Sequence, residues 1–277
     1  MKLKLIIILF TLTAFLKVFS QSYKIVYDFK WKTEENTENY NSELTVLLKN
    51  KENSYFESLA KFKYDSVKTK LVKQGSRNFP APKQQWKLQT LIFKDLKSQT
   101  TITEENFFDK VYLTTYRCKP SWKILQEKSR MFNYNVQKAE ADFGGRKWIA
   151  WFTNEIPISD GPYKFYGLPG LILKISDFKE NFIFEIKGLT KEENNIDERN
   201  AYTAKVNFTP KQWETFWTQY QKDPAMIFAN LNSSNATATY VYYGQNIDSK
   251  EVKEAYNKSE KQKIDVFKNP IELKTCE

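Results

Sequence analysis

The sequence predicts a mainly β protein: a single large, twisted antiparallel β-meander, shaped as a half-barrel or a sandwich, with one or two packed helices. Segments in which apolar and polar residues alternate recur along most of the chain, as in half-buried strands. Turn-forming residues separate these segments, and only one segment has a strong helical period. Because no repeat and no long linker divides the chain, we expect one β-rich domain over residues 21–277.

Residues 1–20, MKLKLIIILFTLTAFLKVFS, have the pattern of a secretory signal peptide, with a basic start at Lys2 and Lys4. The alternative is a membrane anchor, but Lys17 limits the apolar run to about a dozen residues, short of the roughly 20 that span a bilayer. We therefore expect cleavage before Gln21, no transmembrane segment after cleavage, and export to the periplasm, the outer membrane or the medium.

The first predicted strand covers residues 23–32, YKIVYDFKWK, in which the odd-numbered residues are apolar or aromatic and most even-numbered ones are charged. That alternation indicates one buried and one wet face. The pair Gly144-Gly145 separates two further β-like runs and predicts a hairpin turn, since glycine readily takes positive φ. The other predicted strands are residues 43–49, 86–94, 121–128 and 134–143.

The strongest helix signal covers residues 209–224, TPKQWETFWTQYQKDP. Thr209 suits the N-cap, Pro210 the first helical position, and Gln212 completes a capping box. Four aromatic residues then share one helix face, which we expect to pack against the sheet: Trp213, Phe216, Trp217 and Tyr220. A more polar helix is expected over residues 249–263, and a loop over residues 229–238.

The segment GPYKFYGLPGLILKISD, residues 161–177, places turn residues directly before an apolar strand. Pro169-Gly170 suits the centre of a type II turn, because proline presets its φ and glycine accepts positive φ. A hairpin of residues 171–177 and 182–188 should follow, joined by the turn DFKEN. Replacing Gly170 by Val should therefore reduce stability more than Lys174→Val.

This block resembles the signature of the GLPGLI family of exported bacterial proteins, with GRKWIAWFTNEIPISDGPYKF before it and NPIEL at residues 269–273 after it. The resemblance implies an exported, β-rich cell-envelope protein, and the family supplies no catalytic residues. The six residues of the hexapeptide are therefore interpreted as structural: Gly167, Leu168, Pro169, Gly170, Leu171 and Ile172.

The charge of the chain does not point to nucleic acid. The formal net charge is +10, and it falls to +7 when the three lysines of residues 1–20 are removed. Lysines are interleaved with acids, as in KEENNIDER at residues 191–199, which is typical of a solvated face rather than a phosphate-binding stripe. We expect no nucleic-acid partner.

The chain has two cysteines, Cys118 and Cys276. In an exported protein they can form a disulfide, which entropy models credit with roughly 4–5 kcal/mol for so long a loop, or they can be unrelated thiols.

Histidine is absent, which excludes Ser-His-Asp and Cys-His catalysis and histidine-based zinc sites. The chain also lacks a phosphate-binding P-loop and an EF-hand ladder, so we expect no cofactor and no metal. The catalytic candidates that remain are Glu155 and Asp160, which could serve as acid and base at a sheet rim. The alternative is that both are turn residues, with Asp160 capping the reversal at Gly161-Pro162.

Three hypotheses follow for function. The first is a non-catalytic exported protein that binds an envelope protein, a peptide or an amphiphilic ligand in an aromatic-lined concavity of the sheet, with the 213–220 helix laid against it. The second is a carboxylate-dependent hydrolase of glycans or peptides that uses Glu155 and Asp160. The third is a surface adhesin or structural envelope protein.

Overall fold

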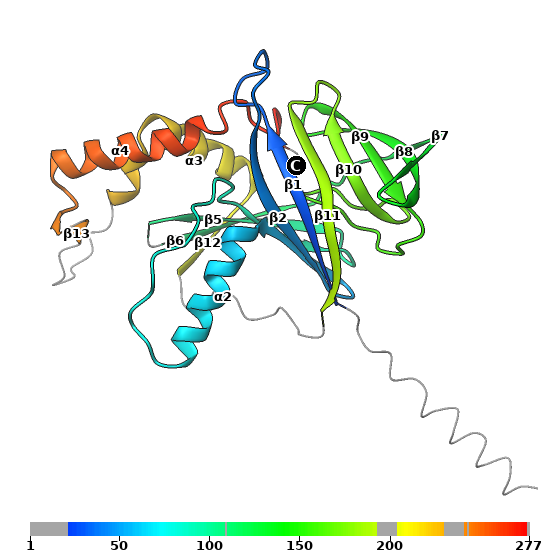
Figure 1. Ribbon diagram of the computed structural model, residues 1–277. Helices are drawn as coiled ribbons and strands as arrows, with labels where there is room; N and C mark the ends of the chain where they lie inside the picture. The colour runs from blue at the N-terminus through cyan, green and yellow to red at the C-terminus, as the bar shows by residue number, and fades with distance from the viewer. Residues whose placement is uncertain (1–21, 109, 193–203, 230–240, 243, 276–277) are drawn as a thin grey trace, which may run out of the picture.

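The computed structural model describes residues 22–108, 110–192, 204–229, 241–242 and 244–275. Twelve strands form one large open sheet, with β12 and β7 at its edges (Figure 1). The strand order is β12-β6-β5-β4-β3-β2-β1-β11-β10-β9-β8-β7. The mainly β, mostly antiparallel fold that the sequence predicts is therefore confirmed.

The first half of the sheet is an antiparallel meander of six strands, because each strand pairs with the next one along the chain. The alternation predicted for the first strand is present: Ile25, Tyr27, Phe29 and Trp31 are all buried on one face, here called the inner face. The strands of this half are β1 (Ser22–Trp31), β2 (Asn41–Lys49), β3 (Asn53–Ser58), β4 (Leu91–Asp95), β5 (Thr100–Phe107) and β6 (Lys110–Tyr116).

A second antiparallel meander forms the other half. Its last strand pairs with β1 and so joins the two halves side by side in the middle of the sheet (Figure 1). The β8–β9 hairpin turns at Gly144 and Gly145, whose φ angles of +60° and +78° confirm the predicted turn. The strands are β7 (Lys123–Met131), β8 (Tyr134–Phe143), β9 (Arg146–Thr153), β10 (Leu171–Asp177) and β11 (Phe182–Glu192).

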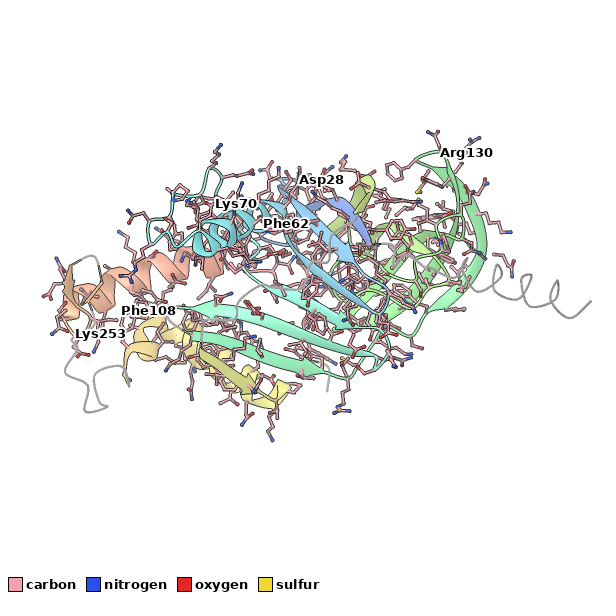
Figure 2. The ribbon with its side chains drawn as sticks, turned by 90° about the horizontal axis from the view of Figure 1, so that it is seen from below. Asp28, Phe62, Lys70, Phe108, Arg130 and Lys253 are labelled. Carbon is pink, nitrogen blue, oxygen red and sulfur yellow. The ribbon has the colours of Figure 1, made fainter. Side chains whose placement is uncertain are left out.

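The strand of the sheet that comes last in the sequence is β12 (Ala204–Phe208), which pairs in parallel with β6. It is followed directly by α3 (Pro210–Lys222). The predicted capping box of α3 is present, since Thr209 and Gln212 each bond the other's backbone N–H. The 3-10 helix η1 (Pro224–Phe228) and α4 (Lys250–Asp265) follow. Phe108 lies at the tip of the β5–β6 hairpin (Figure 2), and its ring contacts that of Phe228. Two short strands, β13 (Val241–Tyr242) and β14 (Gln245–Asn246), form a separate ribbon.

The described residues contain one more α-helix than the sequence predicts, α2 (Leu59–Lys73). Its N-terminus is capped by the Ser58 hydroxyl, which accepts from the Lys61 N–H. It packs through Leu59 on Val46 and Leu48. Because these two strand residues alternate with Leu47 of the main core, α2 covers the sheet face opposite to the inner face (Figures 1 and 2).

The main core lies on the inner face, where the strands meet the long connection between β9 and β10. Phe165 and Leu168 of this connection are almost fully buried, and Phe165 packs against Trp148 with ring centroids 4.5 Å apart. The signature block is therefore an internal part of the core rather than an external turn.

Two local predictions are wrong. Residues 86–90 are not part of a strand, because the N–H groups of Lys87 and Leu88 donate to the Glu43 carboxylate instead of a neighbouring strand. The bend at Pro169-Gly170 is not a type II turn: the φ of Gly170 is +155°, whereas that turn needs roughly +80°, and the Leu171 N–H donates to Ile156 O rather than to Leu168 O. Strand β10 is buried on both faces, and its pairing with β9 has an irregularity between Ile172 and Lys174.

The predicted signal peptide, residues 1–20, lies outside the described residues, as does most of the predicted loop at residues 229–238. None of the described helices combines the length and the apolar character that a membrane crossing requires.

Candidate functional site

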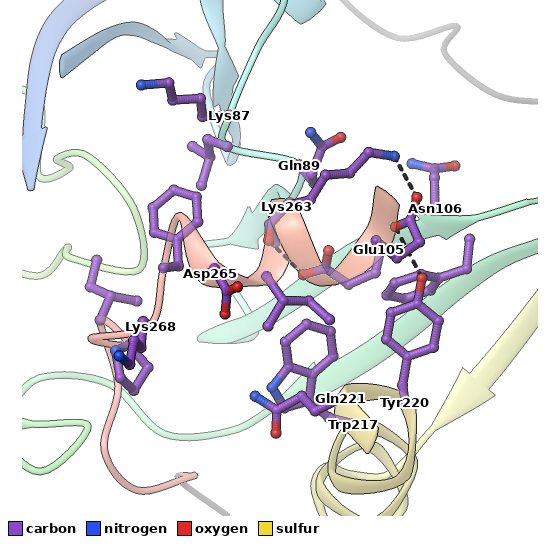
Figure 3. A pocket seen from close by; sticks show the side chains of 18 of the residues that line it. Lys87, Gln89, Glu105, Asn106, Trp217, Tyr220, Gln221, Lys263, Asp265 and Lys268 are labelled. Carbon is purple, nitrogen blue, oxygen red and sulfur yellow. Dashed lines mark hydrogen bonds and ion pairs between the residues drawn. The ribbon is translucent and has the colours of Figure 1, made fainter. Parts of the chain in front are cut away.

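A pocket of about 530 Å³ lies between the inner face of the sheet and the helices α3 and α4 (Figure 3). Strands β1, β3, β5 and β11 contribute its floor, α3 contributes one wall, and α4 with the segment after it contributes the other. Its volume is in the range of small-molecule sites, roughly 300–1,000 Å³.

The α3 wall is aromatic. Phe107 of β5 lies among the rings of the helix, with its centroid 4.5 Å from Tyr220, 6.1 Å from Trp213 and 6.4 Å from Trp217. Trp213 and Trp217 stack on each other at 5.7 Å, because residues four apart share one helix face. The aromatic stripe that the sequence predicts to pack on the sheet therefore also lines the pocket.

The floor of the pocket is aromatic as well. Phe29 and Phe184, neighbours on paired strands, stack with centroids 4.3 Å apart. Phe267, which follows α4, stacks on Trp31 at 4.9 Å and lies 6.4 Å from Phe29. This continuous ring surface gives the pocket a large apolar area without a flexible side chain.

Glu105 is the carboxyl group on the sheet side of the pocket. It lies two residues before Phe107 on β5, so both side chains leave the same face of the strand. Its Oε1 accepts a hydrogen bond from the Thr90 hydroxyl at 2.5 Å. Burial raises the pKa of Glu105 to about 7, although the Thr90 bond and the charge of Lys164 oppose the rise. At neutral pH this group is therefore divided between its acid and its carboxylate.

Other polar groups of the pocket belong to α4 and α3. Glu260 accepts from the Tyr220 hydroxyl at 3.1 Å and pairs with Lys263 at 2.5 Å (Figure 3). Burial raises the pKa of Tyr220, so its hydroxyl stays protonated and available as a donor. Among the described residues, no three carboxylate, cysteine or histidine side chains gather as a metal ligand set.

The segment that follows α4 completes the wall of the pocket and is held by Arg146 at the start of β9. The Arg146 guanidinium donates to Asn269 Oδ1 at 2.5 Å and to Pro270 O at 2.7 Å. It also pairs with Asp177 at 3.3 Å. The NPIEL motif of residues 269–273 thus lies against the Gly144-Gly145 hairpin, although more than 120 residues separate the two in the sequence.

Tyr163 is the residue of the signature segment that reaches the pocket. Its backbone φ is +52°, a conformation uncommon outside glycine, and its ring is buried. The Tyr163 hydroxyl donates to Glu272 Oε1 at 2.5 Å, and Lys164 pairs with the same oxygen at 2.7 Å. These bonds connect the signature segment to the C-terminal segment from inside the protein.

The two catalytic candidates are not brought together. Glu155 is exposed, and its Oε1 accepts from the backbone N–H and the side-chain amide of Asn135 at the β7–β8 hairpin. Asp160 is fully buried, pairs with Lys94 at 2.5 Å and caps the Gly161 N–H at 2.8 Å. Burial lowers the pKa of Lys94, an effect that the Asp160 charge opposes. Both acids therefore have structural partners, and neither lines the pocket.

The hexapeptide is arranged as a structural element. Leu168, Gly170, Leu171 and Ile172 are buried, and Gly167 and Pro169 are exposed. The Ile172 carbonyl accepts from the Tyr27 hydroxyl at 2.8 Å, and the Ser159 hydroxyl donates to Leu168 O.

Cys118 is disulfide-bonded. Its predicted partner, Cys276, lies outside the described residues, so the pairing of the two stays a prediction.

Sequence reasoning missed Glu105, Glu260 and the C-terminal segment as parts of the site. The apolar-polar alternation of residues 100–107 could have placed Glu105 on the same face as Phe107. Nothing in the sequence places that strand opposite α3, because the pairing of β12 with β6 brings them together.

Comparison with known proteins gives a family model and a fold. The family model Porph_ging, described as a protein of unknown function, matches residues 144–174. These residues contain the hairpin glycine and the block that carries the GLPGLI resemblance, and the match is consistent with that resemblance. No sequence among the curated proteins matches the chain.

The solved structures that share the fold include two of PNGF-II. The structure in space group P21 has a TM-score of 0.51 at 16% identity, and the one in space group C2 has a TM-score of 0.52 at 15% identity. Each match covers 73% of this chain and 34% of PNGF-II, so the chain spans about a third of that protein. At this identity the similarity concerns the fold alone. Fold and site together define a β-sheet protein with an aromatic-lined pocket.

Proposed function

We propose that this chain is an exported binding protein whose pocket takes one small amphiphilic molecule. The single observation that carries the proposal is the pocket of about 530 Å³ with aromatic residues on both its floor and its α3 wall. Export rests on the signal-peptide pattern of residues 1–20.

The shape of the site favours a small molecule over a protein partner. A protein surface needs about 800 Å² of contact on each partner, whereas this site is a hollow with walls on three sides. Aromatic rings on the floor and the α3 wall supply apolar contact, and polar groups such as Glu105, Asp265 and the Tyr220–Glu260 pair stand among them. A molecule with an apolar body and a polar group matches this mixed lining.

The proposal is tested with the neutral fluorescent probe N-phenyl-1-naphthylamine, whose emission rises in apolar surroundings. Purified protein that lacks residues 1–20 should bind one equivalent of the probe. Removing the Trp217 ring takes away part of the wall, so Trp217→Ala should weaken binding about tenfold or more, equivalent to about 1.4 kcal/mol or more.

Trp151→Ala is the matched control, because Trp151 of β9 is half-buried like Trp217 and is not part of the pocket wall. Its affinity for the probe should equal that of the wild type. Thermal denaturation of both variants verifies that they are folded. The absence of stoichiometric binding by folded wild-type protein, or equal affinities for the two variants, would contradict the proposal.

A further inference from the structure

The lysines of the pocket wall are all engaged by other groups. Lys263 pairs with Glu260 at 2.5 Å, and Lys268 pairs with Glu34 at 3.1 Å, away from the cavity. Lys87 donates to Asn41 at 2.8 Å and lies over the Trp31 ring. An anionic ligand would therefore have to compete with an existing partner for each of these cations.

Two carboxylates of the pocket lining, Glu105 and Asp265, have no ion-pair partner among the described residues. Glu105 accepts one hydrogen bond, from Thr90, and this bond involves only Oε1. Asp265 lies on the opposite wall, at the end of α4, and its side chain is drawn in the same cavity (Figure 3). These two carboxylates outnumber Lys87, the one cation among the described lining residues whose hydrogen bond goes to a neutral group.

Several aromatic rings line the same pocket as Glu105. Phe107, on the same strand face, meets Tyr220 at 4.5 Å and Trp217 at 6.4 Å, and all three line the cavity. A carboxylate beside several ring faces is the arrangement that binds organic cations, because the ring quadrupole and the acid both attract positive charge.

We propose that the ligand carries an ammonium group, primary or quaternary, held between Glu105 and the rings of α3, with its apolar body on the floor formed by Phe29 and Phe184. This inference rests on the proposed function, whose ligand class it narrows from amphiphiles in general to cationic amphiphiles. Glu105 and the rings of Phe107 and Tyr220 line one cavity of about 530 Å³, so a single ligand can contact both the carboxylate and the rings.

The strength of cation binding depends on the protonation of Glu105. With its pKa raised to about 7, Glu105 gains its negative charge as the pH rises from 6 to 8. The charged and titratable groups around it are Glu104 on its own strand, Lys61 of α2, Lys164, Tyr116 and Tyr163, and the α4 residues of the same pocket, Glu260, Lys263 and Asp265. The Lys164 ammonium forms its ion pair with Glu272, at 2.7 Å, so Lys164 does not neutralise Glu105 in place of a cationic ligand.

The test displaces N-phenyl-1-naphthylamine with three probes that share a ten-carbon chain: decyltrimethylammonium, decyl glucoside and decanoate. At pH 8 the cation should bind about tenfold or more tightly than the glucoside, equivalent to 1.4 kcal/mol or more, and decanoate should bind most weakly. The ratio of cation to glucoside affinity should rise severalfold between pH 6 and pH 8.

The ratio of cation to glucoside affinity is also measured for the variants. A general change in the shape of the pocket alters the affinities for both probes together and leaves their ratio unchanged. Glu105→Gln should bring the ratio down at least fivefold and remove its pH dependence. Glu214→Gln, which makes the same change on the exposed side of α3, should keep the wild-type ratio.

Equal affinity for cation and glucoside in the wild type would overturn the inference and leave the proposed function standing. Tighter binding of decanoate, or an unchanged ratio in Glu105→Gln, would also overturn it. If none of the three probes displaces the dye, or if the dye itself does not bind, the proposed function fails together with the inference.

Discussion

The Arg146 guanidinium donates to the side-chain oxygen of Asn269 at 2.5 Å, and this bond joins the two most widely separated parts of the family-like pattern. Arg146 directly follows the glycine turn of the β8–β9 hairpin, and Asn269 opens the NPIEL segment. Since the residues on either side of Asn269 line the pocket, the bond fixes the position of one pocket wall. Both side chains are buried, so water does not compete for it.

Replacing Arg146 by Ala should destabilise the protein strongly. The change leaves Asp177, Asn269 Oδ1 and the Pro270 carbonyl without the cation that they share. Breaking a buried pair of this kind reduces the free energy of unfolding by about 3 kcal/mol or more. Urea denaturation monitored by tryptophan fluorescence measures the loss.

Lys147→Ala is the control for this change, because Lys147 is the next residue on β9 and its side chain is exposed. Its effect should stay within about 0.5 kcal/mol. If Arg146→Ala were as stable as Lys147→Ala, the C-terminal segment would not be held by this residue.

Local signals in the sequence were sufficient for the elements that depend on them. Three such signals depend only on residues close together in the sequence, and all three features are present: the glycine pair of the β8–β9 turn, the capping box of α3 and the alternation of β1. The aromatic stripe of α3 was also placed correctly, since a wide apolar helix face needs a partner.

The features that the sequence did not reveal depend on contacts between distant segments. Pairing of β1 with β11 and of β12 with β6 sets the strand order, and alternation does not encode a strand's partner. Lys94 occupies a buried position that a charged residue rarely takes, and its partner Asp160 lies 66 residues away. The sequence did not reveal Glu105 as a pocket residue for the same reason, because the other lining residues come from segments far apart in the chain.

Gly170→Ala should destabilise the protein much more than Gly167→Ala. Both glycines have positive φ, +155° and +96°, so the backbone strain of a side chain is present at each. Only at Gly170 would the added Cβ collide with the backbone of Thr153, whereas at Gly167 no atom lies within 4 Å. We expect a loss of about 3 kcal/mol at Gly170 and about 1 kcal/mol at Gly167. Thermal denaturation of the two variants separates them, and similar melting temperatures would refute the close approach.

Lys94→Met should reduce the free energy of unfolding by about 3 kcal/mol, because it leaves the Asp160 charge buried without its partner. Adding Asp160→Asn should restore about 1–2 kcal/mol, since the amide is neutral and its oxygen can still accept from the Gly161 N–H. Chemical denaturation of the single and double variants gives the coupling between the two positions.

The surface pair Lys179–Glu35 provides the comparison for this buried one, at a similar distance of 2.8 Å. With both side chains largely exposed, Lys179→Met should change stability by less than about 0.5 kcal/mol. A double variant of Lys94 and Asp160 that loses more stability than the single Lys94→Met variant would show that the pair is not held together by its charges.

Glu105→Gln should stabilise the unliganded protein at alkaline pH and have little effect at acid pH. Burial raises the pKa of Glu105 from the usual 4.5 to about 7 in the folded state. Between these two values the folded protein binds more protons than the unfolded chain, so wild-type stability falls as the pH rises through this window. Glutamine has the same shape and does not titrate, and its amide oxygen can still accept from Thr90.

The advantage of the glutamine variant should therefore grow between pH 5 and pH 8 and reach on the order of 2 kcal/mol. Urea denaturation of both proteins at several pH values measures the difference, with Glu214→Gln as a control whose difference from the wild type stays constant. A difference that shrinks as the pH rises would mean that Glu105 is stabilised as a carboxylate in the folded state. The direction of the change therefore tests the environment of the pocket carboxyl without any ligand.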